Sequence, residues 1–277
     1  MYLQHFGLDE LPFGLTPDTQ FVFSHADHQA ALNTVLLALQ NGEGFVKVTG
    51  EVGTGKTLLC RRLLRALGER VATAYLPNPN LDALTLYRAI ADELQLAMPA
   101  AADAYQLHRA LNHALLDQAR QGRSVVVLVD EAQAMPLPTL EAIRLLSNLE
   151  TEKRKLLQIV LFGQPELDRH LADPAVRQLR QRIGFHHVLG GLRAVETLAY
   201  LDHRLRVAGL RGASPFSQRL ARLLHRSGHG TPRVINILAH KALLAAFGEG
   251  GHRVRRRHVR AAAADTEGAR SVSWWGW

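Results

Sequence analysis

The sequence contains a single cysteine, Cys60, in 277 residues. A disulfide within the chain is therefore excluded, which suits a reducing compartment. The cysteine falls on the apolar side of a predicted helix, so we interpret it as a small core residue. No H-E-x-x-H pattern accompanies the 14 histidines, so the sequence gives no zinc-ligand spacing.

Long apolar runs are also missing. No stretch approaches the ~20 apolar residues of a membrane-spanning helix. The first six residues have neither a basic region nor a long apolar core, so we do not interpret them as a secretory signal. We expect a cytoplasmic protein, peripheral at the inner membrane if a partner or its own tail holds it there.

Acidic residues are scarce relative to basic ones: 25 against 33, for a net charge of +8. This excess favours anionic partners, namely a nucleotide, nucleic acid or an acidic membrane surface. An arginine-rich segment near the C-terminus is either a contact for DNA or acidic lipid or the solvated face of the last helix, and we favour the solvated face. Its members are Arg253, Arg255, Arg256, Arg257 and Arg260.

The clearest motif that the sequence does contain is a phosphate-binding motif. Residues 50–57 fit G-x-x-x-x-G-K-[ST]. The apolar residues 45–49 before it predict a buried strand, and residues 58–64 after it predict a helix. Strand, glycine-rich loop and helix are the context that this motif requires, so we interpret it as a nucleotide site.

The chemistry of this loop predicts ATP or ADP as its ligand. Backbone N–H groups close around the β-phosphate, and the helix N-terminus adds positive partial charge. Lys56 can reach the β- and γ-oxygens, and Thr57 can hold Mg²⁺, the only metal that we expect. The predicted nucleotide-binding residues of the loop are Gly50, Glu51, Val52, Gly53, Thr54, Gly55, Lys56, Thr57 and Leu58.

A second acidic site follows the most apolar strand, residues 124–129. Asp130 can bind Mg²⁺ directly or through water, and Glu131 can act as general base on the attacking water. Two carboxylates after four valines and a leucine are costly unless they are used. We therefore prefer this interpretation to that of a turn capping the next helix.

The alternation of strands and helices predicts an α/β fold with a parallel five-stranded sheet flanked by helices. The predicted strands are 45–49, 72–76, 124–129, 156–162 and 185–189. Helices are expected at 28–40, 84–94, 104–121 and 139–149, besides the one after the loop. Beyond Gly191 the pattern is all-helical, with helices at 194–208, 217–228, 232–247 and 254–264.

This organisation predicts a P-loop domain over 26–191 and a small helical lid over 192–265. Residues 1–25, rich in aromatics and prolines, are expected to form an extended lead-in that covers a sheet edge or packs against adenine. Residues 266–277 form an aromatic tail. Its tryptophans suit a membrane interface or a partner groove, and equally a disordered end or an intramolecular dock.

These motifs together resemble an AAA+ ATPase, and more narrowly the general secretion pathway protein A type and its relative in biogenesis of the mannose-sensitive haemagglutinin (MSHA) type IV pilus. The broad resemblance is in 50–57, 127–133, 163–167 and 230–236. The narrower one adds Tyr2-Leu3-x-x-Phe6-Gly7 and residues 145–151.

The resemblance implies three further catalytic residues. Gln164 is placed as a polar sensor of the γ-phosphate, and Arg233 as a second sensor at the start of a lid helix. Arg182 matches an arginine that reaches into a neighbouring subunit's site, with Arg180 and Arg177 as rivals. An arginine supplied in trans implies a homo-oligomer, and we expect a ring.

Three functions remain open at this point. The first is a Mg²⁺-dependent ATPase that serves assembly of a type IV pilus or secretion machine, with assembly proteins at the inner membrane as partners. The second is a DNA-dependent AAA+ ATPase of the transposition-regulator or initiator type. The third is a slowly hydrolysing, nucleotide-switched scaffold.

Overall fold

The computed structural model describes residues 2–16, 18, 20–68, 71–97, 102–150 and 155–270. The chain divides into two compact units. The sheet unit consists of Asp27–Glu51 and Leu59–Leu189. The helical unit combines the residues up to Ala26, Val52–Leu58 and the chain from Gly190 onward. The predicted aromatic tail lies outside the described residues from position 271 on.

The sheet unit contains the predicted five-stranded parallel sheet, in the order β2-β3-β4-β1-β5. Its strands are β1 (Phe45–Thr49), β2 (Val71–Leu76), β3 (Ser124–Val129), β4 (Leu157–Gly163) and β5 (Ile183–Val188). The central strands are almost wholly buried, as their continuous apolar sequences predict. The edge strand β5 begins two residues before the predicted position, because its residues alternate between half-buried and exposed and no apolar run marks its start.

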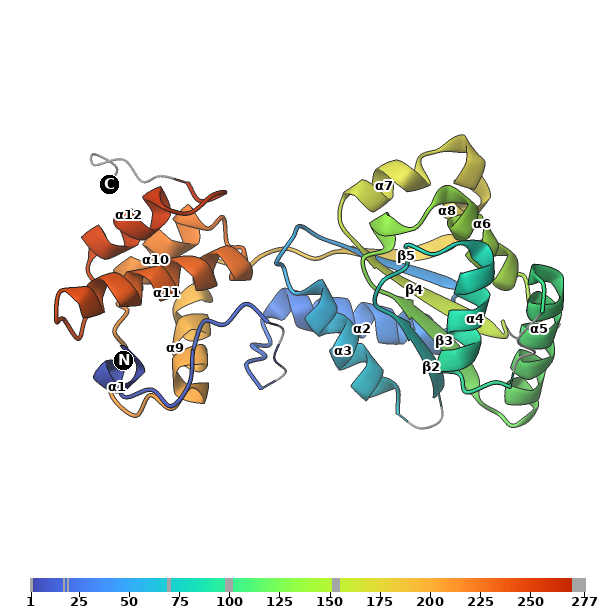
Figure 1. Ribbon diagram of the computed structural model, residues 1–277, viewed down its shortest axis with the longest axis horizontal. Coiled ribbons are helices and arrows are strands. Elements are labelled where there is room, and N and C mark those ends of the chain that lie inside the picture. The colour runs from blue at the N-terminus through green and yellow to red at the C-terminus, as the bar shows by residue number, and fades with distance from the viewer. Residues whose placement is uncertain are drawn as a thin grey trace. The chain divides into compact units, whose positions relative to one another are not determined.

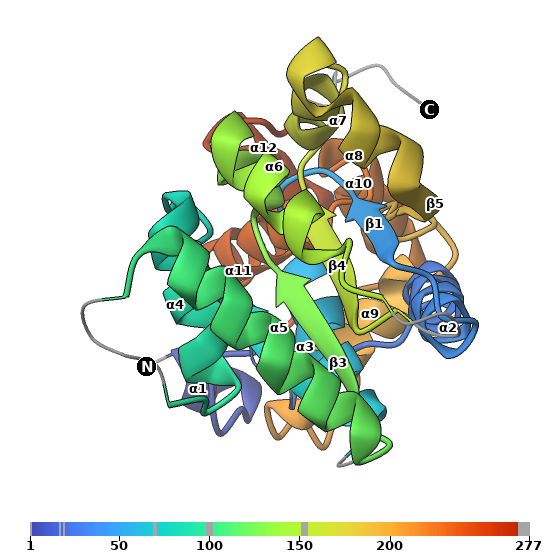
Figure 2. The ribbon, with the colours of Figure 1, turned by 90° about the vertical axis from the view of Figure 1, so that its right-hand side faces the viewer.

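Helices cover both faces of this sheet (Figures 1 and 2). Side chains alternate along β3, so Val126 and Leu128 pack with α2 and α3, whereas Val125 and Val127 pack with α4, α5 and α6. The long helices are α2 (Ala26–Gln40), α3 (Lys56–Leu67), α4 (Ala83–Glu93), α5 (Ala104–Arg120) and α6 (Leu137–Leu146). Shorter elements not predicted from the sequence are η1 (Ala132–Ala134), α7 (Glu166–Leu171), η2 (Pro174–Val176) and α8 (Arg177–Arg182).

The helical unit contains the four helices expected after Gly191. They are α9 (Thr197–Val207), α10 (Gln218–Ser227), α11 (Pro232–Gly248) and α12 (Arg256–Ala264). Their apolar faces share one core in which Leu201, Leu224 and Leu238 are fully buried. No helix among the described residues is long and apolar enough to cross a membrane.

The lead-in differs from its prediction. Tyr2–Phe6 forms a short helix, α1, rather than extended chain. The aromatic side chains of Tyr2, Phe6, Phe13 and Phe21 are buried in the core of the helical unit, so the prediction that this segment covers a sheet edge is wrong. A five-residue helix has too few positions to show a helical period in its sequence, so α1 was not predicted. Burial of its aromatic side chains in that core stabilises it. Packing against adenine stays a prediction.

Candidate active site

The glycine-rich loop has the predicted context, because β1 precedes it and α3 begins at Lys56. At the carboxyl end of β1, the Gly50 N–H donates to the Gly163 carbonyl at 3.1 Å. Gly53 and Gly55 have φ values of +80° and +99°, a region that glycine adopts at little cost. Within the loop Thr54 is buried, as is Lys56 at its end.

Arg233 lies against this loop inside the helical unit. Its backbone N–H donates to the Gly53 carbonyl at 3.3 Å. A Cβ added to Gly53 would lie 2.4 Å from the Arg233 Cβ, so no larger residue fits there without movement. Pro232 occupies the first turn of α11, where its missing N–H costs little. Two residues predicted to act on one nucleotide are therefore neighbours.

Replacing Gly53 with alanine is expected to weaken ATP binding by about tenfold or more, since strain at positive φ costs ~1–3 kcal/mol and the new methyl displaces Arg233. Gly42→Ala is the matched control, because Gly42 also has φ +80° but open space around it. Titration with a fluorescent ATP analogue measures the affinity, and thermal denaturation measures stability. Equal ATP affinities of the two variants would contradict this expectation.

Asp130 and Glu131 follow β3, as predicted. Asp130 is buried, and its Oδ1 accepts the Glu131 N–H at 3.0 Å. The Tyr75 hydroxyl, from the neighbouring β2, lies 3.5 Å from the other oxygen, Oδ2. Burial, together with the nearby Asp130 charge, raises the pKa of Tyr75 to about 12, so this hydroxyl remains a donor at neutral pH. Sequence reasoning missed Tyr75, which looks like an ordinary strand residue.

Glu131 has a strained backbone, with φ 51° and ψ 39°. This left-handed conformation costs a non-glycine residue about 1–3 kcal/mol and is concentrated at functional sites. Its Oε2 accepts hydrogen bonds from the side-chain amides of Gln133, at 2.5 Å, and of Gln164, at 3.1 Å. The structure therefore brings the predicted base and the predicted γ-phosphate sensor together.

Gln133 completes this group and was not singled out from the sequence. Its Oε1 accepts the backbone N–H of Gln164 at 2.9 Å, while its amide donates to Glu131. One side chain thus ties the end of β3 to the end of β4. Gln133 lies two residues after Glu131, within the short 3₁₀ helix η1. Without a prediction of η1, this spacing did not indicate that the two side chains meet.

The predicted trans arginine lies on α8, in the sheet unit. Arg182 is exposed and its Nη1 donates to the Ser147 hydroxyl at 3.0 Å. Arg180 and Arg177 are also exposed. All three are open to solvent, so the choice among them stays a prediction.

The residues predicted to hold Mg²⁺ carry suitable donors. Thr57 offers a hydroxyl in the first turn of α3, and Asp130 offers a carboxylate at the end of β3. Hard oxygen donors of this kind fit Mg²⁺, which is usually held by one or two carboxylates together with phosphate and water. Within the described part of the chain, no three His, Cys, Asp or Glu side chains are grouped to hold a metal by themselves.

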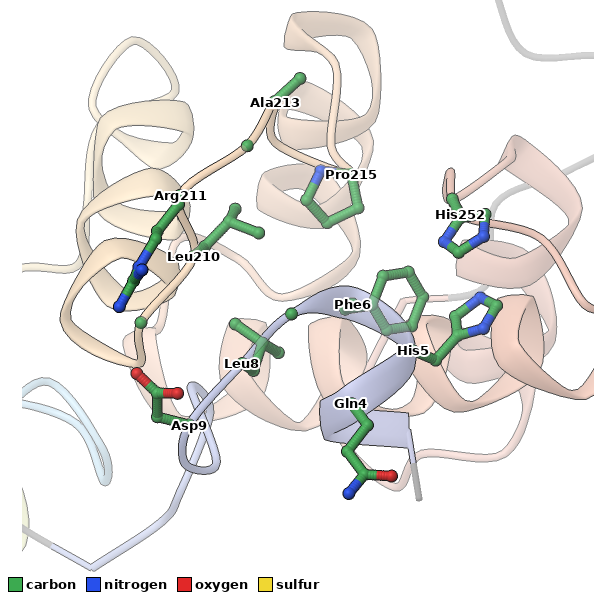
Figure 3. A pocket seen from close by; sticks show the side chains of 13 residues that line it. Gln4, His5, Phe6, Leu8, Asp9, Leu210, Arg211, Ala213, Pro215 and His252 are labelled. Atoms are coloured by element: carbon green, nitrogen blue, oxygen red, sulfur yellow. The ribbon is translucent and has the colours of Figure 1, made fainter.

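A pocket of about 660 Å³ lies elsewhere in the helical unit (Figure 3). One wall is α1 with the residues after it, and the other is formed by residues 209–213, Pro215 and His252. The rings of His5 and His252 stack with centroids 4.1 Å apart. None of the described residues that line this pocket belongs to the predicted nucleotide motifs.

The fold is that of the AAA P-loop proteins: a five-stranded parallel sheet with flanking helices, a phosphate-binding loop after β1 and an acidic pair after β3. The family model described as AAA domain matches residues 39–171.

Over 297 aligned residues the chain is 40% identical to general secretion pathway protein A of Aeromonas hydrophila, with 100% of this chain and 54% of that protein covered. The chain thus spans about half the length of that relative. The chain is thus similar to the AAA domain family over residues 39–171 and to general secretion pathway protein A over its whole length.

Solved structures share the fold at low identity. ORC2 of Aeropyrum pernix, in its ADPNP–ADP complexes, is 20% identical, with a TM-score of 0.64 over 91% of this chain and 72% of that one. ORC1 of the same organism, in complex with DNA, is 21% identical, with a TM-score of 0.62 over 92% of this chain and 69% of that one. At these identities the likeness concerns the fold alone.

Proposed function

We propose that this chain is a Mg²⁺-dependent AAA+ ATPase that couples ATP binding and hydrolysis to assembly of a cell-envelope machine, a type IV pilus or a secretion system. The 40% identity to general secretion pathway protein A along the whole chain carries the assembly part. The loop at 50–57 and the Glu131 carboxylate held by two amides support the ATPase part.

The residues of this site support hydrolysis of ATP by an attacking water. Backbone N–H groups of the loop and the Lys56 ammonium would bind the phosphates of ATP, the nucleotide that ORC2 also binds as an analogue. Mg²⁺, held by Thr57 and Asp130, would neutralise phosphate charge. Glu131 would accept a proton from the attacking water, with its carboxylate oriented by the amides of Gln133 and Gln164.

Two arginines would supply the remaining positive charge that stabilises the phosphates. Arg233, beside the loop, would contact the γ-phosphate. Arg182 would stabilise the transferring phosphoryl group of a neighbouring subunit, which makes hydrolysis depend on a homo-oligomer, in our proposal a ring. Loss of the γ-phosphate would then release Gln164 and Arg233.

The partners that we propose are pilus or secretion assembly proteins at the inner membrane, with the MSHA pilus as the narrower candidate. The test is made in cells that encode this chain. Lys56→Ala is expected to abolish pilus display or secretion while the chain still co-fractionates with the envelope. Normal pili and secretion in that variant would contradict the assembly role.

A second candidate is a DNA-dependent ATPase. The charge of +8 and the exposed side chains of Arg253 and Arg255, just before α12, favour it. In the same region Arg257 is paired with Glu249, which fits a solvated surface instead. DNA-stimulated hydrolysis that weakens steeply with salt would select this candidate.

A further inference from the structure

We infer that Tyr200 and Asn236 are positioning residues for Arg233, linked through Arg204 to the N-terminal segment. The inference rests on the proposed function, because it assigns these residues to the sensing of ATP. All the residues involved belong to the helical unit, so the contacts that follow are internal to it.

Asn236 marks the point where this network meets α11. It lies three residues after Arg233, one helical turn along, and is 5% exposed. Its Oδ1 accepts a hydrogen bond from the Tyr200 hydroxyl of α9 at 2.7 Å. Burial raises the pKa of Tyr200, so the hydroxyl stays protonated and remains the donor. This bond fixes how the first turn of α11 is rotated against α9.

Arg204 extends the network to the N-terminal segment. Its Nη1 donates to the Tyr200 hydroxyl at 3.3 Å, and its Nε donates to the Pro12 carbonyl at 2.5 Å. Its Nη2 reaches the Gly14 carbonyl at 3.4 Å, and the guanidinium lies 4.7 Å from the centre of the Phe21 ring. No ion pair joins this buried cation to a carboxylate of the described residues, so neutral dipoles and an aromatic face hold it.

Burying such a polar network costs more desolvation free energy than burying apolar side chains. The other buried side chains of this core are mostly leucine, alanine and phenylalanine, which bury without any hydrogen-bond requirement. A fully satisfied polar network gives instead one defined geometry, since every donor and acceptor has a direction. The feature that needs a defined geometry here is the first turn of α11, which carries Arg233 against Gly53.

The chain offers a matched control in Tyr2. Its hydroxyl also bonds to a side chain of α11, His240, at 3.1 Å, and Tyr2 belongs to the same core, although its bond is partly rather than fully buried. His240 lies seven residues after Arg233, two turns along the helix. Tyr2→Phe and Tyr200→Phe therefore both delete a hydroxyl bonded to α11, but only the second removes a bond to Asn236, one helical turn from Arg233.

The experiment measures dissociation constants for ATP and ADP on the full chain carrying Glu131→Gln, which keeps ATP intact. Arg233→Ala is expected to remove most of the preference for ATP over ADP. Tyr200→Phe is expected to reduce that preference about fivefold, the equivalent of one neutral hydrogen bond, and Tyr2→Phe to change it less than about twofold. Adding Tyr200→Phe to Arg233→Ala should produce no further loss, because both act on one interaction.

Other outcomes are equally decisive. If Tyr200→Phe lowers the melting temperature as Tyr2→Phe does and leaves the ATP preference unchanged, the positioning role is overturned while the proposed function stands. If Arg233→Ala leaves the preference unchanged, the sensor itself fails and the inference falls with it. Should Tyr200→Phe not fold, Tyr200→Phe combined with Asn236→Leu removes both partners of the bond and gives the same readout.

Discussion

Arg182→Ala is expected to lower the ATPase rate per subunit by about 10³-fold or more, the loss seen when an arginine that stabilises a transferring phosphoryl group is removed. The affinity for ATP should change little, because the arginine acts on a neighbour's transition state. Arg182 is exposed on α8 and is therefore accessible to a second subunit. Hydrolysis assays at saturating ATP, over a range of protein concentrations, measure the effect.

The same helix supplies the controls. Arg177→Ala and Arg180→Ala remove the same charge from neighbouring exposed positions and should keep the rate within a few-fold. Ser147→Ala tests whether the contact of Arg182 within its own chain matters, since Ser147 is its hydrogen-bond partner. If Arg180→Ala alone abolished ATP hydrolysis, Arg180 would be the trans arginine. Near-normal hydrolysis rates in all three arginine variants would contradict the proposal that an arginine acts in trans.

Glu131→Gln is expected to lower the rate by about 10²–10⁴-fold, the usual contribution of a general base. ATP binding should persist, because the loop, Lys56 and Asp130 are unchanged. The glutamine keeps the size of Glu131 and can still accept from the amides of Gln133 and Gln164. Single-turnover hydrolysis and nucleotide titration separate the two effects.

Glu93→Gln is the matched control for this substitution. Glu93 is an exposed carboxylate on α4, outside the predicted nucleotide motifs, and a glutamine there can still accept the Tyr75 backbone N–H, so the chemical change is identical while the catalytic position is untouched. We expect its rate to stay within about twofold of the unmodified chain, as surface substitutions usually do. If Glu93→Gln and Glu131→Gln lost activity equally, Glu131 would not be the base.

Much of the nucleotide site could be predicted from local sequence. The loop at 50–57 has a motif that dictates its own backbone, and β3 is apolar from Val125 to Val129 because both of its faces are buried there. The ends of such strands are marked by the first polar residues, which is why Asp130 and Glu131 could be identified. The parallel sheet followed from the alternation of strands and helices, whereas its strand order was not predicted.

The residues that were missed depend on contacts distant in sequence. Gln133 becomes informative only when β4 lies beside β3, which brings Gln164 to it. Arg204 binds carbonyl groups almost 200 residues away, in a lead-in that the sequence predicted as extended. Hydrophobic periodicity reports which face of a helix is buried, and it does not report which polar groups are paired inside the core.

The most direct test of the account is the ATP hydrolysis rate per subunit against protein concentration, with Mg²⁺, in the presence and absence of duplex DNA. We predict a rate that rises with concentration as subunits assemble, that is unaffected by DNA and that disappears in Lys56→Ala. A rate that requires DNA would contradict the envelope-assembly function. ATP-dependent assembly with almost no turnover would identify a nucleotide-switched scaffold and contradict the claim of an ATPase.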